Sequence, residues 1–341
     1  MQKINYKVAV MDNVDKGTVW FAVINGYAAS RQAGALWKKT EELLKSKGVV
    51  FHGTKTGRAG NAAELTFDAC LAGYRRFIAV GGDGTVHDVL NGIAGYVDWC
   101  SASGRPARFS DFTLGVIPLG SGNDWIRSYG IKKDIESAID FIRNAHVVRQ
   151  DVVRVSLLDS FRLPYEAELS VSYMVNIGGA GIDARVCELV NQSRKEGKGG
   201  KILYVTSLLK AISKRVPAKA KVICDSVEVF DGSYLSIAFG TGKYSGGGMR
   251  QTPEAVTDDG LLDVTIIPDI PLRRIVMEVH RLFTGTFNRI PELTICRGKK
   301  VLVIPHDGGS FEPVEVDGEV VGKAPVRFEV LEDQINVVSA Q

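Results

Sequence analysis

The sequence has few cysteines, and their arrangement excludes two kinds of cysteine-dependent scaffold. Only five occur among 341 residues, an odd number, and none forms a Cys-X-X-Cys pair. Disulfide frameworks use even sets of cysteines, and structural zinc sites use closely paired ones. We therefore expect neither, and a reducing compartment fits these scattered thiols.

Long apolar runs and a strong excess of one charge are also missing. No stretch approaches the roughly 20 apolar residues of a transmembrane helix. The opening residues, MQKINYKVAVMDNVDKG, lack the continuous apolar stretch of a signal peptide. A net charge of +3 is too small to indicate a nucleic-acid partner. These absences predict a cytoplasmic protein whose contact with any membrane is peripheral.

The composition is that of a globular protein, and the first part of the chain alternates strands and helices. Hydrophobic residues make up 45% and charged residues 24%, which suffices for a core, and the length favours two domains. Strands are expected at 18–25, 49–54, 76–80 and 112–120, with helices at 31–47, 61–74, 79–93 (after its opening strand and turn) and 134–144. Such alternation predicts a parallel sheet covered by helices on both faces.

After about residue 146 strand-like runs dominate, among them VVRQDVVRVSLL, YLSIAFGTG and VRFEVLEDQINVV. Turn residues separate these runs, which is typical of an antiparallel sandwich or barrel. Two helical patterns interrupt them, at about 182–212 and 271–286. We expect an α/β domain over 1–146 and a β domain over 147–329, with the tail 330–341 able to return to the first domain.

The segment AVGGDGTVHDVLNGI, residues 79–93, joins a short strand to a helix through three glycines around Asp83. Free backbone N–H groups and a helix N-terminus make such a turn an anion site. It is not a dinucleotide fingerprint, because the third glycine position holds His87, and it lacks the Gly-Lys-Ser/Thr of a P-loop. Asp83 is explained by Mg²⁺ accompanying a phosphate, by proton transfer, or simply by helix capping.

A second glycine turn, IPLGSGNDWIRSYGI at 117–131, follows the next predicted strand. Gly120 and Gly122 flank Ser121, and Asn123 and Asp124 open a helix. Turns at the carboxyl ends of neighbouring parallel strands face one crevice, where open α/β folds bind ligands.

The two turns together resemble the diacylglycerol kinase catalytic-domain family, which includes bacterial lipid kinases, sphingosine kinases and ceramide kinases. The resemblance runs from about residue 18 to 335, through VNIGGAGIDARV, GKYSGGGMRQTPEAVTDDGLLDVTII and VEVDGEVV. It implies an α/β domain like that of NAD kinases, followed by an antiparallel β-sandwich. It also implies an ATP- and Mg²⁺-dependent lipid kinase of phospholipid metabolism, acting on a diacylglycerol-like or sphingoid acceptor.

The resemblance assigns nucleotide-binding roles to ten residues: Asn25, Thr56, Gly81, Gly82, Asp83, Gly84, Thr85, Ser121, Asn123 and Asp124. It departs at Gly26, where the family usually has proline. A metal position is implied at Asp259, completed by the carbonyls of Val256 and Leu261. On sequence alone, the Asp-Asp-Gly stretch is equally explained as a β-turn.

The resemblance also makes Glu319 the base that deprotonates the lipid hydroxyl, with Asp83 organising metal or phosphate. The reversed assignment, with Asp83 as the base, stays open. The residues VEVDGEVV are by themselves explained as a hairpin, because Asp-Gly lies between alternating apolar residues.

Residues 191–221 contain nine Lys or Arg residues against the single acid Glu196, with apolar residues at helical spacing. Such a segment can lie on an anionic membrane surface, where the lipid substrate resides. It is equally typical of a helix packed on the sandwich with a solvated basic face.

Two other functions remain open on the sequence: a soluble-metabolite kinase of the NAD kinase superfamily, and a non-catalytic lipid-binding regulatory protein. The oligomeric state is also open, and a homodimer is one state the sequence allows.

Overall fold

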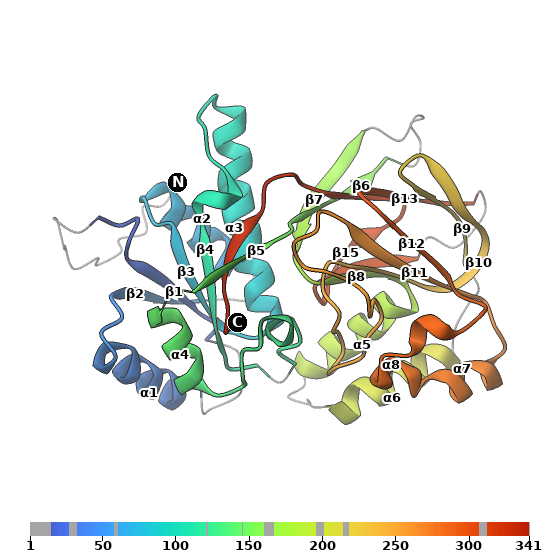
Figure 1. Ribbon diagram of the computed structural model, residues 1–341, viewed down its shortest axis with the longest axis horizontal. Coiled ribbons are helices and arrows are strands. Elements are labelled where there is room, and N and C mark those ends of the chain that lie inside the picture. Colours follow the sequence, from blue (N-terminus) through green and yellow to red (C-terminus); the bar gives the residue numbers. More distant parts are fainter. Residues whose placement is uncertain are drawn as a thin grey trace.

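The computed structural model describes residues 15–26, 33–57, 61–120, 122–144, 146–159, 167–195, 201–213, 218–306 and 312–340. These residues form two halves side by side, one α/β and one rich in β-strands (Figure 1). The predicted fold class is confirmed: a mostly parallel sheet with helices on both faces, then an antiparallel sandwich.

The first half is built on a six-stranded sheet in the order β2-β1-β3-β4-β17-β5. Its strands are β1 (Trp20–Ile24), β2 (Phe51–Lys55), β3 (Arg76–Gly81), β4 (Thr113–Pro118), β5 (Val147–Gln150) and β17 (Ile335–Val338). All neighbours are parallel except β17 and β5.

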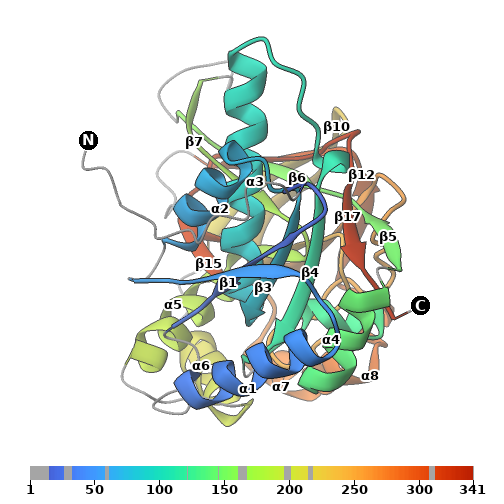
Figure 2. The same cartoon turned by 90° about the vertical axis from the view of Figure 1, so that its left-hand side faces the viewer.

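Four helices cover the two faces of this sheet (Figure 2). They are α1 (Ala33–Ser46), α2 (Ala62–Leu71), α3 (Asp83–Ala102) and α4 (Ile135–Asn144). Side chains of α2 and α3 share one core cluster, and those of α1 and α4 share another. Each face therefore buries its own apolar layer, which explains why the buried strands carry almost continuous apolar runs.

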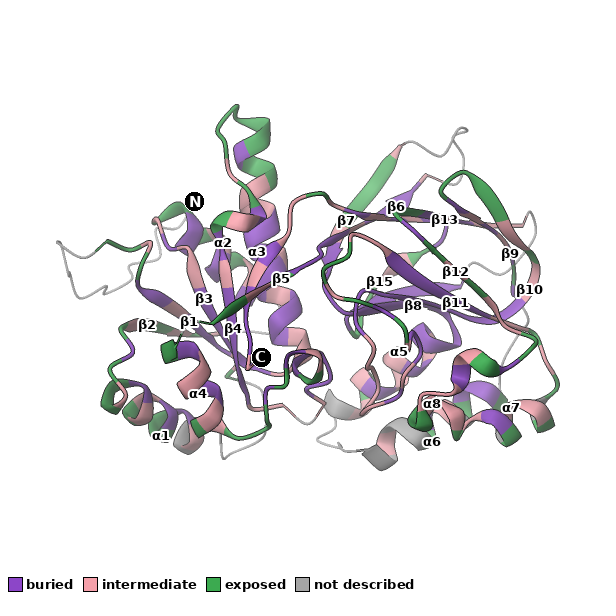
Figure 3. Cartoon of the chain, viewed as in Figure 1, coloured by how far each residue is buried: buried purple, intermediate pink, exposed green. Residues whose placement is uncertain are grey.

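The second half is antiparallel. Its strands are β6 (Val153–Leu158), β7 (Glu168–Met174), β8 (Ile177–Gly181), β9 (Ala218–Cys224), β10 (Val227–Gly240), β11 (Leu262–Pro268), β12 (Thr294–Gly298), β13 (Lys300–Pro305), β14 (Pro313–Val316), β15 (Glu319–Lys323) and β16 (Val326–Val330). Its core includes Phe239 stacked on Phe328, with ring centroids 4.0 Å apart. Strands β8 and β14 are buried along their whole length, and β11 is buried along most of its length (Figure 3).

Four helices gather at one end of the second half: α5 (Ile182–Lys195), α6 (Lys201–Ser213), α7 (Leu272–Glu278) and α8 (Arg281–Thr284) (Figure 1). The helical patterns expected at 182–212 and 271–286 correspond to these pairs. Among the described residues, no helix is both long and apolar enough to cross a bilayer.

Two runs that read as single strands in the sequence are each divided between the two sheets. In 147–158, β5 joins the first sheet and β6 the second. In 326–338, β16 stays in the second sheet and β17 returns to the first. The break in the first run falls at Asp151, whose buried carboxylate accepts hydrogen bonds from Gly260 N and Gln334 Nε2, both at 2.8 Å.

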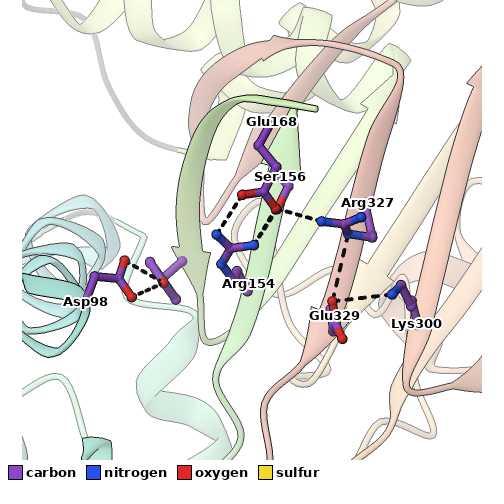
Figure 4. A network of polar contacts seen from close by, with 8 residues as sticks. Asp98, Arg154, Ser156, Glu168, Lys300, Arg327 and Glu329 are labelled. Carbon is purple, nitrogen blue, oxygen red and sulfur yellow. Dashed lines mark hydrogen bonds and ion pairs between the residues drawn. The ribbon is translucent and has the colours of Figure 1, made fainter. Parts of the chain in front are cut away.

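The segment 97–111 is rich in Ser, Gly and Pro, a composition that predicts a loop, but its first part is helical. Helix α3 continues for 20 residues to Ala102, because residues 97–103 contain no glycine or proline. The hydroxyl of Tyr173 in β7 donates to Asp98, with Oδ1 and Oδ2 at 2.9 and 2.8 Å (Figure 4). The long helix therefore contacts both halves of the molecule.

Candidate active site

The two glycine turns meet at the carboxyl edge of the first sheet. Strands β3 and β4 are parallel neighbours, with Gly81 opposite Pro118. A Cβ built on Gly120 would lie 2.6 Å from the Cα of Gly82, closer than real Cβ contacts come. The turns therefore touch through their backbones, and glycine is required for that approach. This is the crevice that the sequence predicted.

Asp83 links the two turns. It is the first residue of α3, yet its carboxylate accepts hydrogen bonds from the backbone N–H groups of Asp124 and Trp125, both at 3.2 Å. Burial, and then the negative charge of Asp124, raise the pKa of Asp83. Its carboxylate thus caps the neighbouring turn rather than its own helix, in surroundings that a bound cation would stabilise.

The second turn is fixed by its own polar side chains. Asn123 is buried in a left-handed conformation, φ 52°, which asparagine tolerates better than most residues. Its Nδ2 donates to the carbonyl of Gly120 at 2.7 Å. The carboxylate of Asp124 accepts from Arg127 Nε at 3.0 Å and from the backbone N–H of Gly247 in the second half. Asp124 therefore ties the two halves together, while Ser121 lies outside the described residues.

The remaining predicted nucleotide residues lie at the same sheet edge. Asn25 Nδ2 donates to Thr85 Oγ1 at 3.1 Å, and the backbone N–H of Gly26 donates to Thr56 Oγ1 at 3.1 Å. Thr85 is buried, and a Cβ on Gly81 would overlap its hydroxyl. The Thr85 side chain thus packs against Gly81 on the buried side of the turn. The backbone N–H groups of the turn stay available to a ligand.

A hairpin from the second half carries Glu319 to this edge. Strands β14 and β15 are joined by Asp317 and Gly318, both with positive φ, as the Asp-Gly pair predicted. Glu319 Oε1 lies 3.3 Å from the position that a Cβ on Gly84 would occupy. Both residues assigned to catalysis by resemblance therefore approach the same glycine turn, from opposite halves of the chain.

Buried polar contacts hold that hairpin in place. The carboxylate of Asp317 accepts from the backbone N–H groups of Val175 and Asn176, at 3.1 and 3.0 Å. It also lies 3.6 Å from Nδ1 of His87 on α3. Burial alone would lower the pKa of His87, but hydrogen bonding and charge from Asp317, together with Asp88, raise it overall. A protonated His87 would thus bridge α3 and the hairpin.

Between the halves lies a cleft of about 130 Å³. Its polar lining includes Asp83, Asp124, Asn176, Asp183, Gln251, Glu315 and Asp317. Burial raises the pKa of Asp183 to about 6 and that of Glu315 well above its ordinary value. The sequence did not single out these two acids, although both belong to motifs quoted for the resemblance. Their role in the cleft follows only from their place in its lining, which the folded chain creates.

The oxygen donors of this cleft suit magnesium. In the described parts of the chain, no three His, Cys, Asp or Glu side chains converge to hold a metal by themselves. Mg²⁺ commonly takes one or two carboxylates and completes its shell with phosphate oxygens and water. Asp83, beside the phosphate-type turn, fits that requirement.

The other predicted metal position lies apart from the cleft lining. Asp259 pairs with Arg297, and its Oδ1 accepts from the backbone N–H of Leu261 at 3.1 Å. Val256 is half-exposed beside the same turn. An arginine already neutralises this carboxylate, and the metal role of the three residues stays a prediction.

An apolar pocket of about 60 Å³ adjoins the cleft. The two spaces share Asp183 and Gln251 in their walls. Gln251 Nε2 donates to Asp183 at 2.8 Å, and Ser236 also donates to it. The rest of the pocket is mostly aliphatic, including Leu208, Ile212, Leu235, Ile275, Val279 and Leu282. The polar cleft and the apolar pocket therefore meet at the buried carboxylate of Asp183.

The basic segment 191–221 falls mainly on α5 and α6, with 196–200 and 214–217 outside the described residues. Leu203, Leu208 and Ile212 of α6 pack into a cluster with α5 and Leu235. These apolar side chains therefore cover the sandwich, and docking of this segment on a membrane stays a prediction.

Fold and cleft together place the chain among two-domain proteins with an NAD kinase-like β-sandwich. Residues 19–155 match the diacylglycerol kinase catalytic domain, and residues 176–339 match the YegS C-terminal NAD kinase beta sandwich-like domain. The chain thus combines a diacylglycerol kinase catalytic domain with a YegS-type C-terminal domain.

The similarity to known proteins extends over most of the chain. A "Probable lipid kinase YegS-like" of Enterobacter sp. (strain 638) is 26% identical over 92% of this chain and 93% of its own. One from Cronobacter sakazakii is 27% identical over 72% and 73%. A solved Bacillus anthracis diacylglycerol kinase structure has a TM-score of 0.65 at 18% identity, covering 94% of this chain and 97% of its own. These similarities support a lipid kinase-like family and fold.

Proposed function

We propose that this protein transfers the γ-phosphoryl group of ATP, with Mg²⁺, to the hydroxyl of a lipid. The observation that carries the proposal is the meeting of three features at one cleft: paired glycine turns, carboxylates from both halves, and an adjoining apolar pocket. The proposal concerns the use of ATP and Mg²⁺ and the choice of a lipid as the acceptor.

The protein's contribution is to position groups and to organise charge. The turns at Gly82 and Gly120 would cradle the phosphates with backbone N–H groups. Mg²⁺, when bound, neutralises charge on the transferring phosphoryl group. Asp83 would hold that ion together with the phosphates, since its carboxylate is oriented by two backbone N–H groups.

Glu319 would accept the proton of the acceptor hydroxyl. It is exposed at the end of a rigid hairpin, and its carboxylate stands beside Gly84. An alcohol is a weak nucleophile, so a positioned carboxylate that takes its proton assists transfer. Burial first, and then the negative charge of Glu319, raise the pKa of Asp88 to about 6, so a second acid lies close to Glu319.

The apolar pocket favours a lipid over a soluble metabolite. Its mostly aliphatic lining offers few polar partners to a nucleotide or sugar but can bury a hydrocarbon chain at roughly 0.8 kcal/mol per methylene. The shared Asp183 would lie near the polar head of an acceptor whose tail enters the pocket.

The test is phosphoryl transfer from labelled ATP, with Mg²⁺, to a panel of dispersed diacylglycerol, sphingoid base, monoacylglycerol and NAD. We expect a labelled lipid, and no product without Mg²⁺. Labelled NAD instead would establish the soluble-metabolite kinase. ATP-independent lipid binding with no product from any acceptor would establish a non-catalytic protein.

A further inference from the structure

Helices α7 and α8 present large apolar side chains to solvent. Met277 is 64% exposed and Phe283 is 49% exposed, and they lie on two short helices that follow one another in the chain. The opposite side of the same helices is buried, because Ile275, Val279 and Leu282 line the apolar pocket. These helices therefore form a wall that is apolar on both its inner and its outer face.

The charges around this outer face are positive. Arg273 and Arg289 are exposed, and within the described residues neither forms an ion pair. In contrast, Arg274 pairs with Glu278 and Glu292, and Arg281 pairs with Glu278. Exposed apolar residues flanked by unpaired guanidinium groups complement an anionic lipid surface.

The neighbouring helix does not supply this surface. The apolar side of α6 packs inward with α5, and Ile275 of α7 borders the same cluster. Helices α6, α7 and α8 lie together at the lower end of the second half (Figure 1). The exposed apolar side chains at this end are those of α7 and α8, as far as the described burial extends.

We propose that the outer surface of α7, α8 and the short 3-10 turn Phe287–Arg289, which contacts α8, docks on an anionic lipid bilayer through Arg273, Met277, His280, Phe283 and Arg289. This places the wall of the apolar pocket against the membrane, so that a lipid acceptor can pass between the two. The passage of acceptor rests on the proposed function, whereas docking itself is measured without ATP or acceptor.

The first experiment compares full-length variants by sedimentation with vesicles of equal parts phosphatidylcholine and phosphatidylglycerol. The double variant Met277→Ser/Phe283→Ser should partition at least about tenfold more weakly than the wild type, because two exposed apolar side chains no longer enter the interface. The matched control is Leu169→Ser/Val227→Ser on β7 and β10, whose side chains are 69% and 64% exposed. That control should bind like the wild type.

A second pair of variants tests the charges. Arg273→Gln/Arg289→Gln should bind the mixed vesicles more weakly and lose most of the salt dependence, while binding to pure phosphatidylcholine stays unchanged. Lys38→Gln/Lys39→Gln on α1, exposed on the other half, removes the same charge and should have little effect.

Retained circular dichroism and retained phosphorylation of a short-chain, monomeric acceptor would show that the variants are folded. Docking by this face is overturned if Met277→Ser/Phe283→Ser binds vesicles like the wild type, or if the Leu169→Ser/Val227→Ser control weakens binding equally. A wild type that does not bind vesicles overturns it as well. It is also overturned if sedimentation velocity shows this face buried between two copies, so that Met277→Ser/Phe283→Ser dissociates a dimer. Vesicle binding without any kinase activity would instead contradict the proposed function and leave the docking intact.

Discussion

At the scale of single residues, the first glycine turn brings together two carboxylates that are far apart in the sequence. Asp83 is oriented by two backbone N–H groups of the neighbouring turn, whereas Glu319 stands free of such bonds among the described contacts and faces Gly84. A carboxylate held by backbone donors suits a fixed charge near phosphates. One at an exposed turn suits proton transfer.

Glu319→Gln should lower single-turnover phosphoryl transfer by about 10²–10⁴-fold, because the amide cannot take the hydroxyl proton. ATP affinity in the presence of Mg²⁺ should change little. Asp83→Asn should weaken Mg²⁺-dependent ATP binding as well as turnover. Calorimetric ATP affinity with and without Mg²⁺, paired with single-turnover rates, distinguishes the two. Full nucleotide affinity in Asp83→Asn, together with an active Glu319→Gln, would reverse the roles.

Gly120→Ala should separate the glycine turns, because its Cβ would stand 2.6 Å from the Cα of Gly82. We expect ATP affinity to fall at least about tenfold and stability to fall by roughly 1–3 kcal/mol, the usual cost of overpacking. Gly104→Ala is a useful contrast: a Cβ there meets nothing within 4 Å, although its φ of +67° carries some strain. Its stability change should appear without any loss of ATP affinity, and equal ATP losses would contradict a phosphate role for the turns.

At the scale of elements, the β-sandwich is fastened on one face by a charged network (Figure 4). Arg154 of β6 forms two hydrogen bonds to Glu168 of β7, which also accepts from Ser156 and from Arg327 of β16. The bond from Arg154 is the main cause that lowers the pKa of Glu168 to about 2. Three neighbouring strands are thus joined through one carboxylate.

This network gives the sandwich an acid-sensitive contribution to stability. Because the folded pKa of Glu168 lies below its ordinary value of 4.5, the contribution is complete above about pH 4.5 and is lost as the pH falls toward 2. Glu168→Gln should cost roughly 1–3 kcal/mol at neutral pH and flatten the decline of stability with acid. Urea unfolding across this pH range measures both effects.

The exposed pair of Glu41 with Lys45 on α1 is the control for that measurement. Glu41→Gln should change stability by about 0.5 kcal/mol or less, since exposed helical pairs contribute little. A Glu168→Gln variant with the wild-type pH dependence would show that the network adds nothing to the sandwich.

At the scale of the whole molecule, the chain crosses twice between the sheets, and the cleft lies between the halves that these crossings join. Asp151 sits at one crossing, and Gln334, just before β17, sits at the other. Asp124 and Gly247 add a contact near the cleft. These polar contacts, together with the packing of Tyr173 and Val175 into the core of the first half, hold the two halves in position.

Asp151→Asn should destabilise the protein by roughly 1–3 kcal/mol, because an amide nitrogen would face the Gly260 N–H or the Gln334 amide in place of an acceptor. It should also weaken ATP binding, through looser placement of the second half. Asp140→Asn, at an exposed ion pair with Lys47, supplies the comparison. Chemical unfolding and calorimetric ATP titration measure the two effects, and equal behaviour of both variants would remove Asp151 from this role.

The sequence by itself determined the fold class and the parts of the site that depend on short segments. A strand, a glycine turn and a helix are local features, and neighbouring parallel strands end at the same edge, so the meeting of Gly82 with Gly120 could be predicted. The Asp317–Gly318 hairpin followed from two residues with positive φ between apolar alternation.

Tertiary structure decided what depends on distant packing. The same alternating pattern fits either sheet, so only the packed halves divide 147–158 and 326–338 between them. The apolar side of α6 faces inward because α5 and Leu235 cover it, and α7 and α8 leave Met277 and Phe283 in solvent. Asp183 and Glu315 line the cleft, where elements far along the chain bury them. This burial removes water from their carboxyl groups and raises their pKa values.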